Sequence, residues 1–230
     1  MKTVSPDLDW KGDQVPVSKQ FNDPYYSLDN GLHEAQHVFL TANGLPDRFQ
    51  DGFSIAELGF GTGLNFLTTL QSWQRFGQEG RLQYTGFEAY PLTQIDLRRA
   101  LEPFHTIAPL ALKLVDGWPD LLKTGKLKTA DVSLSLIIGD ARETVLQWNG
   151  RADCWYLDGF SPAKNTELWE TGLLSEVYSH TKSGGTAATY TAAGYVRRNL
   201  VEAGFKGERA KGYGRKRHMT LACKGSKDEE

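Results

Sequence analysis

The sequence predicts a doubly wound α/β sheet closed by an antiparallel C-terminal hairpin. Three observations carry this prediction: short apolar strands alternate with helices, a glycine turn joins the first strand to the first helix, and two strand-like segments lie near the end of the chain. At 230 residues the chain fits one large domain, which buries about 70% of the surface that its unfolded form exposes. A second domain is not needed to account for the length.

Residues 50–224 are expected to form this domain, with residues 1–49 as an N-terminal extension packed on it and residues 225–230 as a polar tail. Within the extension, His33-Glu34-Ala35-Gln36-His37 matches the zinc-protease pattern of two histidines one helical turn apart. A catalytic zinc needs a third protein ligand, which this pattern does not supply. We therefore expect no metal, and instead an amphipathic helix that packs through Leu32, Val38, Phe39 and Leu40.

The alternation of patterns places the remaining elements in order. Strands are expected at residues 53–58, 82–88, 132–138, 153–157 and 186–191, and helices at 64–77, 92–103, 141–149, 166–182 and 193–203. Residues 106–129 contain Pro109, Trp118 and Pro119 and are expected to be a connection larger than the fold requires. After Gly204, residues 205–213 and 218–224 flank a basic turn, which is typical of an antiparallel hairpin.

The turn after the first strand has the features of a nucleoside-cofactor site. It runs from Glu57 through Gly59, Gly61 and Gly63 into a helix. Glycines permit positive φ and close approach of the backbone to a ligand, while the first turn of the helix presents unpaired N–H groups. Dinucleotide sites place the third glycine three residues after the second, but here it follows by two, so the spacing favours S-adenosylmethionine over NAD. The alternative is a tight turn that needs small residues.

Carboxylates recur at the ends of the expected strands. The first four parallel strands end at or just before Glu57, Glu88, Asp140 and Asp158. Because ligands bind outside the carboxyl ends of parallel strands, these acids indicate one site. Glu88 suits the two ribose hydroxyls, and Asp140 suits an adenine amino group. Any one of these acids, taken alone, could equally be a helix N-cap or a solvated loop residue. Those roles do not account for an acid at the end of each of the four strands.

The net charge of −2 argues against a large nucleic-acid footprint, yet it hides a basic cluster. Residues 206–217 carry six basic side chains and one acidic one, and Arg197 and Arg198 lie in the preceding helix. Such a cluster beside a cofactor site predicts phosphate contacts and salt-dependent binding, with an ordinary solvated basic loop as the alternative.

Targeting signals are absent from the sequence pattern. No run of 18 apolar residues occurs and the first 20 residues are polar, so we expect neither a membrane span nor a secretory signal, and a cytoplasmic protein.

From about residue 15 to residue 222 the chain resembles the MnmC-type methyltransferases. The resemblance rests on residues 56–66 (AELGFGTGLNF), 158–165 (DGFSPAKN), 184–198, 212–219 and 21–32. It implies a class I S-adenosylmethionine-dependent methyltransferase that makes 5-methylaminomethyl-2-thiouridine at the wobble position of certain tRNAs. Many members also carry a C-terminal FAD-dependent oxidase, for which these 230 residues leave no room. The resemblance therefore implies, as partners, tRNA and a separate or fused oxidase that acts earlier in the same pathway.

The resemblance also implies roles for particular residues. Those expected to hold S-adenosylmethionine are Glu57, Gly59, Phe60, Gly61, Gly63, Asn65, Glu88, Asp140, Ala141 and Asp158. Asp158 is also the expected catalytic residue, facing the point where the methyl group meets the substrate amine. Expected substrate contacts are Tyr26, Phe160, Lys164, Tyr190, Arg197, Arg215, Lys216 and Arg217.

The implied reaction requires a neutral amine. An alkyl ammonium with a pKa near 10.4 is neutral in only about one molecule in 10³ at pH 7, a handicap of roughly 4 to 5 kcal/mol. A carboxylate near its reference pKa of about 3.9 is a poor general base at neutral pH. We therefore expect Asp158 mainly to orient the amine, with proximity supplying most of the acceleration.

Two other functions fit parts of the pattern. A methyltransferase acting on a small-molecule or protein amine would share every cofactor residue and would not need the basic hairpin. A non-catalytic nucleic-acid-binding scaffold would keep the fold and lose the cofactor, which the four acids at the strand ends disfavour.

Overall fold

The computed structural model describes residues 5–12, 14–27, 30–77 and 79–226. Most of the expected tail at 225–230 lies outside these residues. Within them, the central sheet has eight strands in the order β10-β11-β9-β8-β4-β5-β7-β6. Its parallel strands are β4 (Ser54–Leu58), β5 (Leu82–Glu88), β7 (Val132–Ile138), β8 (Ala152–Leu157) and β9 (Thr181–Thr189).

Antiparallel strands complete both edges of the sheet. β6 (Lys126–Lys128) pairs with β7, while β10 (Lys206–Lys211) and β11 (His218–Cys223) form a hairpin that joins the sheet through β9. The predicted doubly wound sheet with a closing hairpin is thereby confirmed.

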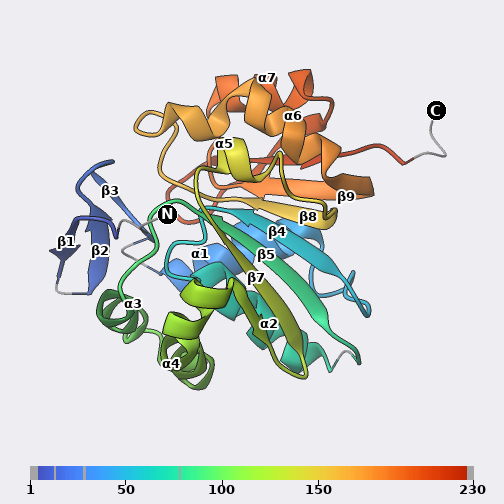
Figure 1. Ribbon diagram of the computed structural model, residues 1–230. Helices are drawn as coiled ribbons and strands as arrows, with labels where there is room; N and C mark the ends of the chain where they lie inside the picture. The colour runs from blue at the N-terminus through green and yellow to red at the C-terminus, as the bar shows by residue number, and fades with distance from the viewer. Residues whose placement is uncertain (1–4, 13, 28–29, 78, 227–230) are drawn as a thin grey trace.

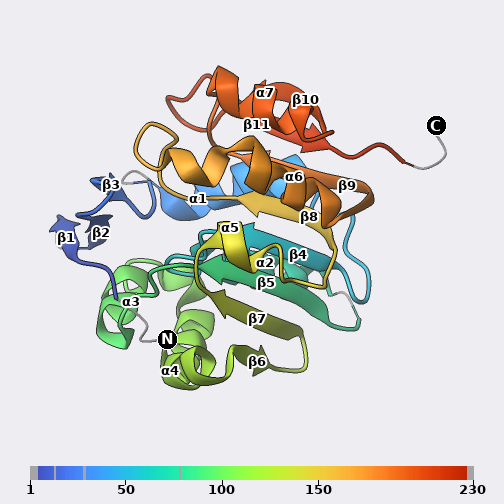
Figure 2. The same cartoon turned by 45° about the horizontal axis from the view of Figure 1, so that its top comes forward.

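Helices cover both faces of the sheet (Figures 1 and 2). Because successive strand residues point to opposite faces, β4 sends Ile55 into one core and Ala56 and Leu58 into the other. The first core lies under α2 (Leu64–Phe76) and α4 (Ala108–Thr124), and the second under α5 (Ala141–Thr144), α6 (Thr171–Ser179) and α7 (Gly194–Glu202). α3 (Gln94–Leu101) packs against α4.

Residues 106–129 correct the sequence-based expectation of an oversized connection. After a 3-10 turn (His105–Ile107), most of the segment forms the 17-residue helix α4, with Pro119 inside it. Proline lacks an N–H and leaves the carbonyl four residues earlier without its helical donor. Here that carbonyl belongs to Val115, and the side chain of Gln94 donates to it at 2.8 Å. This long-range hydrogen bond lets the helix continue past the proline.

Two expected helices are shorter in the structure. Residues 141–149 form only α5, after which Trp148 packs edge-on against Phe87 and Trp155. Residues 166–182 divide into a 3-10 turn (Thr166–Trp169) and α6, and β9 begins at Thr181, five residues earlier than expected. The strand passes through Gly184 and Gly185 with a register shift, so these glycines mark an irregular strand and not a loop.

The N-terminal residues add a small antiparallel sheet that the sequence did not reveal, formed by β1 (Leu8–Lys11), β2 (Val15–Ser18) and β3 (Asp23–Pro24). It lies beside α3 (Figure 1). The histidine-containing run forms α1 (Gly31–Ala35) and a π-helical turn (Gln36–Leu40) that bury Val38, Phe39 and Leu40. No group of three His, Cys, Asp or Glu side chains in the described residues could hold a metal ion.

None of the helices in the described residues combines the length and the apolar character that a membrane crossing requires.

Candidate functional site

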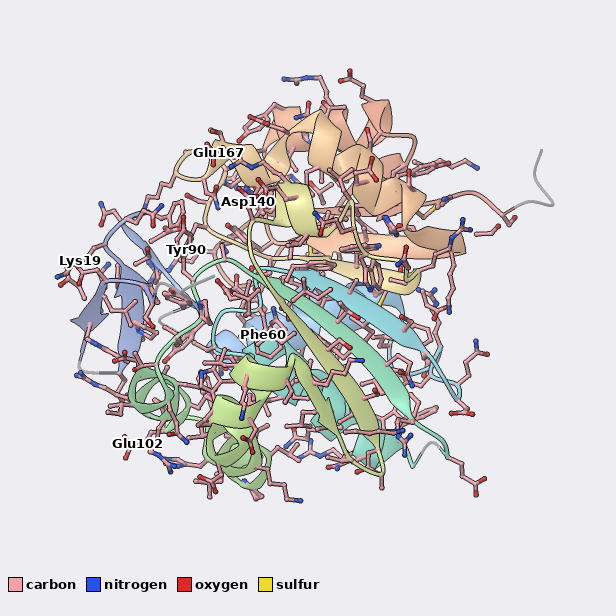
Figure 3. The ribbon with its side chains drawn as sticks, in the orientation of Figure 1. Lys19, Phe60, Tyr90, Glu102, Asp140 and Glu167 are labelled. Carbon is pink, nitrogen blue, oxygen red and sulfur yellow. The ribbon has the colours of Figure 1, made fainter. Side chains whose placement is uncertain are left out.

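A cavity of about 710 Å³ opens at the carboxyl ends of β4, β5 and β8. Its walls come from the turns after these strands and after β7, from residues in 20–27 and 31–34, and from the tip of the β10–β11 hairpin. In Figure 3, Tyr90, Asp140 and Glu167 are labelled above Phe60, which lies near the middle of the view, and all four line the cavity. The cavity thus lies at the edge of the sheet where the sequence predicts the site.

The glycine turn brings the backbone to the cavity wall. Gly59, Gly61 and Gly63 have φ values of 77°, 55° and 71°, which side-chain-bearing residues rarely adopt. Gly59 and Gly61 line the cavity, but Gly63 does not, and a Cβ there would lie 3.0 Å from Leu114 and from the ring of Phe60. The third glycine therefore serves packing. Phe60 lines the cavity while its ring lies parallel to that of Trp118.

Gly59→Ala is expected to destabilise the protein by about 2 to 4 kcal/mol, because the new Cβ would lie 2.5 Å from the carbonyl oxygen of Asp158 in a left-handed conformation. Chemical denaturation measures this. Gly52→Ala is the matched control, since Gly52 has φ 72° but no heavy atom within 4 Å of the added methyl; it should lose only about 1 kcal/mol. Equal losses in the two variants would mean that the close approach to Asp158 is unimportant.

Glu88, at the end of β5, is held by the backbone of two turns. One carboxylate oxygen accepts from Gly61 N and the other from Tyr90 N, each at 2.7 Å. Burial raises the pKa of this carboxyl, and the backbone donors oppose the rise. Glu88 lines the cavity with its position fixed by these bonds, as a group that accepts from a ligand's hydroxyls should be.

Asp140 and Arg142 form a second polar wall. Asp140 caps α5 by accepting from Arg142 N at 2.9 Å, and its carboxylate also pairs with the Arg142 guanidinium. The guanidinium lowers the pKa of the Asp140 carboxyl. Ala141 lines the cavity beside them, and Glu167 lies 3.5 Å from Arg142.

Asp158, at the end of β8, is the carboxyl most strongly shaped by its surroundings. One oxygen accepts from Gly159 N at 3.0 Å and the other from the side-chain amide of Asn65 at 2.7 Å. Burial raises the pKa of Asp158 to about 7, Glu34 adds to the rise, and Lys216 opposes it. The premise that this carboxyl stays near its reference pKa is therefore wrong. It can hold or release a proton at neutral pH.

Glu57 lies behind this wall. It is 0% exposed and does not line the cavity, although the motif predicts a cofactor contact there. Its two oxygens accept from the Asn65 amide at 2.7 Å and from the Tyr84 hydroxyl at 2.8 Å. Burial, and next the charge of Asp158, raise the pKa of Glu57 well above its usual range.

Three of the expected substrate contacts are aromatic residues in the cavity wall. Phe160 stacks on Phe21 with ring centroids 4.7 Å apart and meets the edge of Tyr25. Tyr190 donates its hydroxyl to the Gly159 carbonyl at 2.8 Å. The hydroxyl of Tyr26 lies 2.9 Å from the carbonyl oxygens of Ala100 and Gln14, so that this side chain presents its ring to the cavity.

The expected basic contacts divide into two groups. Arg215 and Lys216 line the cavity, whereas Lys164, Arg197 and Arg217 do not. Lys164 instead binds the Asn22 carbonyl and the Asp23 carboxylate, and so ties the N-terminal segment to the loop after β8. Arg197 is half-buried on α7, and no described residue accepts from its buried Nη1.

Sequence reasoning missed Glu34, which lines the cavity from α1. Its side chain is 14% exposed, and one oxygen lies 2.8 Å from the Lys216 ammonium, which also stands 4.4 Å above the ring of Tyr190. Glu34 lies within the histidine-containing run, whose pattern indicates a zinc motif or an amphipathic helix but gives no sign of a cavity contact. Other lining residues not singled out are Gln20, Phe21, Asp23, Tyr25, Tyr90, Arg142, Ser161, Asn165, Glu167 and Leu168.

Comparison with known proteins gives consistent findings. A family model described as S-adenosyl-L-methionine-dependent methyltransferase matches residues 105–225. The bifunctional tRNA 5-methylaminomethyl-2-thiouridine biosynthesis protein MnmC of Aeromonas hydrophila is 42% identical over 97% of this chain, and that of Pseudomonas aeruginosa is 43% identical over 92%. The matched parts are 36% and 34% of those relatives, so the chain spans about a third of their length.

The crystal structure of MnmC2 from Aquifex aeolicus shares the fold. It superimposes with a TM-score of 0.79 at 24% sequence identity, covering 98% of this chain and 72% of that one.

The cavity fits an S-adenosylmethionine cofactor. It has room for a nucleoside, and Gly59 and Gly61 bring the backbone to its wall. A side chain at Gly59 is excluded, because its Cβ would collide with the carbonyl oxygen of Asp158. Two fixed carboxylates, Glu88 and Asp140, face it as acceptors. The chain belongs to the S-adenosyl-L-methionine-dependent methyltransferase family whose model matches its C-terminal half.

Proposed function

We propose that the protein transfers the methyl group of S-adenosylmethionine to the primary amine of 5-aminomethyl-2-thiouridine at the tRNA wobble position, giving 5-methylaminomethyl-2-thiouridine. The observation that carries this proposal is a carboxyl with a pKa of about 7, Asp158, in the wall of a cavity rimmed by Arg215 and Lys216. Such a site can receive an amine from a polyanionic substrate. The names of the MnmC relatives support the choice of nucleoside.

The cofactor, when bound, supplies an activated methyl group on a sulfonium. On the protein side, Glu88 would accept from the ribose hydroxyls and Asp140 from the adenine amino group, while Gly59, Gly61 and Ala141 would allow close approach of the backbone. This assignment is supported by the fixed orientation of both carboxylates. Asn65 and Asp158, joined by a hydrogen bond in the cavity wall, are proposed to face the position where the methyl group would meet the amine.

Asp158 is also proposed to remove the proton that the substrate amine must lose before it reacts. The substrate amine arrives mainly as an ammonium and attacks only after losing a proton. A carboxylate whose pKa is about 7 is matched to taking that proton at neutral pH. Phe160, Tyr190 and Tyr26 line the same cavity, and their aromatic surface is proposed to limit the access of water to the reacting groups.

The direct test is transfer of labelled methyl from S-adenosylmethionine to tRNA from cells that lack this activity, followed by nucleoside analysis. We expect label in 5-methylaminomethyl-2-thiouridine. If the protein binds the cofactor but no tRNA nucleoside becomes labelled, the proposal is rejected, and a small-molecule or protein amine is favoured as the substrate. Protein that binds no cofactor would instead favour the scaffold function.

Lys216→Gln is expected to raise the KM for tRNA about fivefold and to lower the salt dependence of KM by about one unit of logarithmic slope, because a single phosphate contact is lost. Steady-state kinetics between low and moderate salt measures both. Lys128→Gln is the matched control, since Lys128 is equally exposed on β6 at the opposite edge of the sheet. An unchanged slope for Lys216→Gln would assign Lys216 only to its ion pair with Glu34.

The proposal extends to partners and location. A tRNA substrate places the reaction in the cytoplasm. An FAD-dependent oxidase, separate or fused, is proposed to act earlier in the same pathway; the additional length of the bifunctional relatives supports this partner. The division into an extension at 1–49, a domain at 50–224 and a tail at 225–230 likewise stands as a proposal.

A further inference from the structure

Glu57 occupies the motif position of a cofactor carboxylate, yet its surroundings suit a different task. It is fully buried at the end of β4, and the cavity wall runs in front of it. A carboxylate that binds a ligand must present an oxygen to it. Both oxygens of Glu57 are instead used within the protein, by Asn65 and Tyr84.

The Asn65 amide joins Glu57 to the reacting centre. A side-chain amide has two N–H groups, and here one points to Glu57 and the other to Asp158, each at a nitrogen–oxygen distance of 2.7 Å. With both N–H groups committed, the amide plane is fixed, and the Asp158 oxygen that it holds is fixed with it. Asn65 is 7% exposed and lies in the first turn of α2, so the helix adds to this rigidity.

Two carboxyls that share one amide nitrogen are too close to be ionised together in a buried site. Asp158 lines the cavity, where a cationic ligand and Lys216 favour its charge, whereas Glu57 has no access to the cavity. The other groups around the pair are Glu34 from α1, Tyr190 from the turn after β9, and Tyr84, Tyr156 and Glu88 on the strand side. None of these five groups is a cation, so Lys216, on the cavity side, is the cation among the groups that face the pair, and the strand-side groups contribute no positive charge that would favour a charge on Glu57.

We propose that Glu57 is a neutral positioning residue, which keeps its proton, holds Asn65 through a hydrogen bond, and thereby orients Asp158 and leaves it as the ionisable member of the pair. Its side chain thus supports the methyl-transfer centre without touching the cofactor. This inference rests on the proposed function for the role of Asp158, but its cofactor-binding test does not need the substrate.

Two substitutions separate this role from a cofactor contact. In neutral Glu57 one oxygen would accept from Asn65, and the carboxyl O–H would donate to the Tyr84 oxygen, so the bond to Tyr84 would run opposite to that of the ionised form. In Glu57→Gln, the amide reproduces this arrangement, because its oxygen accepts from Asn65 and its NH₂ donates to the Tyr84 oxygen. We expect a Kd for S-adenosylmethionine within about threefold of wild type between pH 6 and 9, and kcat within about threefold. Glu57→Met keeps the length of the side chain and removes the acceptor. We expect its kcat to fall at least about tenfold, with the Kd within about threefold.

Isothermal calorimetry gives the Kd, and single-turnover transfer to tRNA gives the rate. The matched control is Tyr156→Phe, which removes a buried hydroxyl that bonds to Thr69 and to neither carboxyl; its kcat should equal that of wild type even if its Tm falls. A merely structural role for Glu57 would lower the Tm of Glu57→Met and leave kcat unchanged, and that result would overturn the proposal.

A Kd for Glu57→Gln raised more than about tenfold would also overturn it, because it would show that the ligand needs the charge. If Glu57→Met does not fold, the Kd of Glu57→Gln for S-adenosylmethionine alone tests whether Glu57 contacts the cofactor as a charged group. Failure of the proposed function looks different, since wild-type protein would then not methylate tRNA while the calorimetric comparison remained valid.

Discussion

Asp158→Asn is expected to lower kcat for methyl transfer by about 10²- to 10⁴-fold, because the amide cannot take the proton of the substrate ammonium. In wild-type protein, kcat should rise as the pH increases through about 7, where the carboxyl ionises. The variant should not show this rise in kcat near pH 7, and should retain only the pH dependence that comes from ionisation of the substrate amine. Single-turnover transfer at saturating S-adenosylmethionine, followed from pH 5.5 to 9, measures both effects.

Stability provides an independent check on Asp158. The pKa of this carboxyl is raised in the folded protein, so its contribution to stability is full below the ordinary pKa of the group and is lost as the pH rises through about 7. Asp158→Asn should therefore raise Tm relative to wild type above pH 7. Asp153→Asn, which removes the charge that pairs with Lys182 and weakens the hydrogen bond from Ser54 N at the other end of β8, should lower Tm and leave kcat unchanged. A kcat for Asp158→Asn within threefold of wild type would exclude the proton-transfer role.

Glu88→Gln is expected to raise the Kd for S-adenosylmethionine about 10- to 100-fold. The substitution removes the charge that strengthens hydrogen bonds to ligand hydroxyls, and it turns an NH₂ group toward the backbone N–H of Gly61 or Tyr90. Calorimetry at fixed pH measures the change. Glu102→Gln is the control, because Glu102 is exposed after α3 and does not line the cavity (Figure 3).

A different outcome would give Glu88 another role. If Glu88→Gln lowered Tm but left the Kd within twofold of wild type, the carboxylate would serve only to brace the two turns whose N–H groups it accepts.

The central sheet and three of its acids were predictable because their signals are local. An apolar strand that ends at or just before an acid has the same pattern wherever it occurs, and Glu88, Asp140 and Asp158 line the cavity as that pattern predicts. The same pattern gave no means of separating Glu57 from them. Whether a carboxyl at a strand end faces the cavity or the core depends on its neighbours, here Asn65 and Tyr84.

The remaining parts depend on contacts between distant residues, which composition and periodicity do not record. Glu34 and Lys216 form an ion pair although they are 182 positions apart in the sequence. Lys164 does not line the cavity because it binds Asp23, which is 141 positions away. α4 was missed for the same reason, because the hydrogen bond that accommodates Pro119 comes from Gln94 on another helix. Its sequence alone looks like an interrupted connection.

The meeting of Glu34 and Lys216 also constrains when the site can form during translation. The cavity needs residues from 20–27 and 31–34 and the tip of the hairpin between β10 and β11, segments that leave the ribosome at very different times. A nascent chain that has emerged only as far as β9 already has the glycine turn and the carboxylates Glu88, Asp140 and Asp158, but no cationic rim. The residues proposed to hold the cofactor are thus all synthesised before Arg215 and Lys216, the basic residues proposed to meet the substrate.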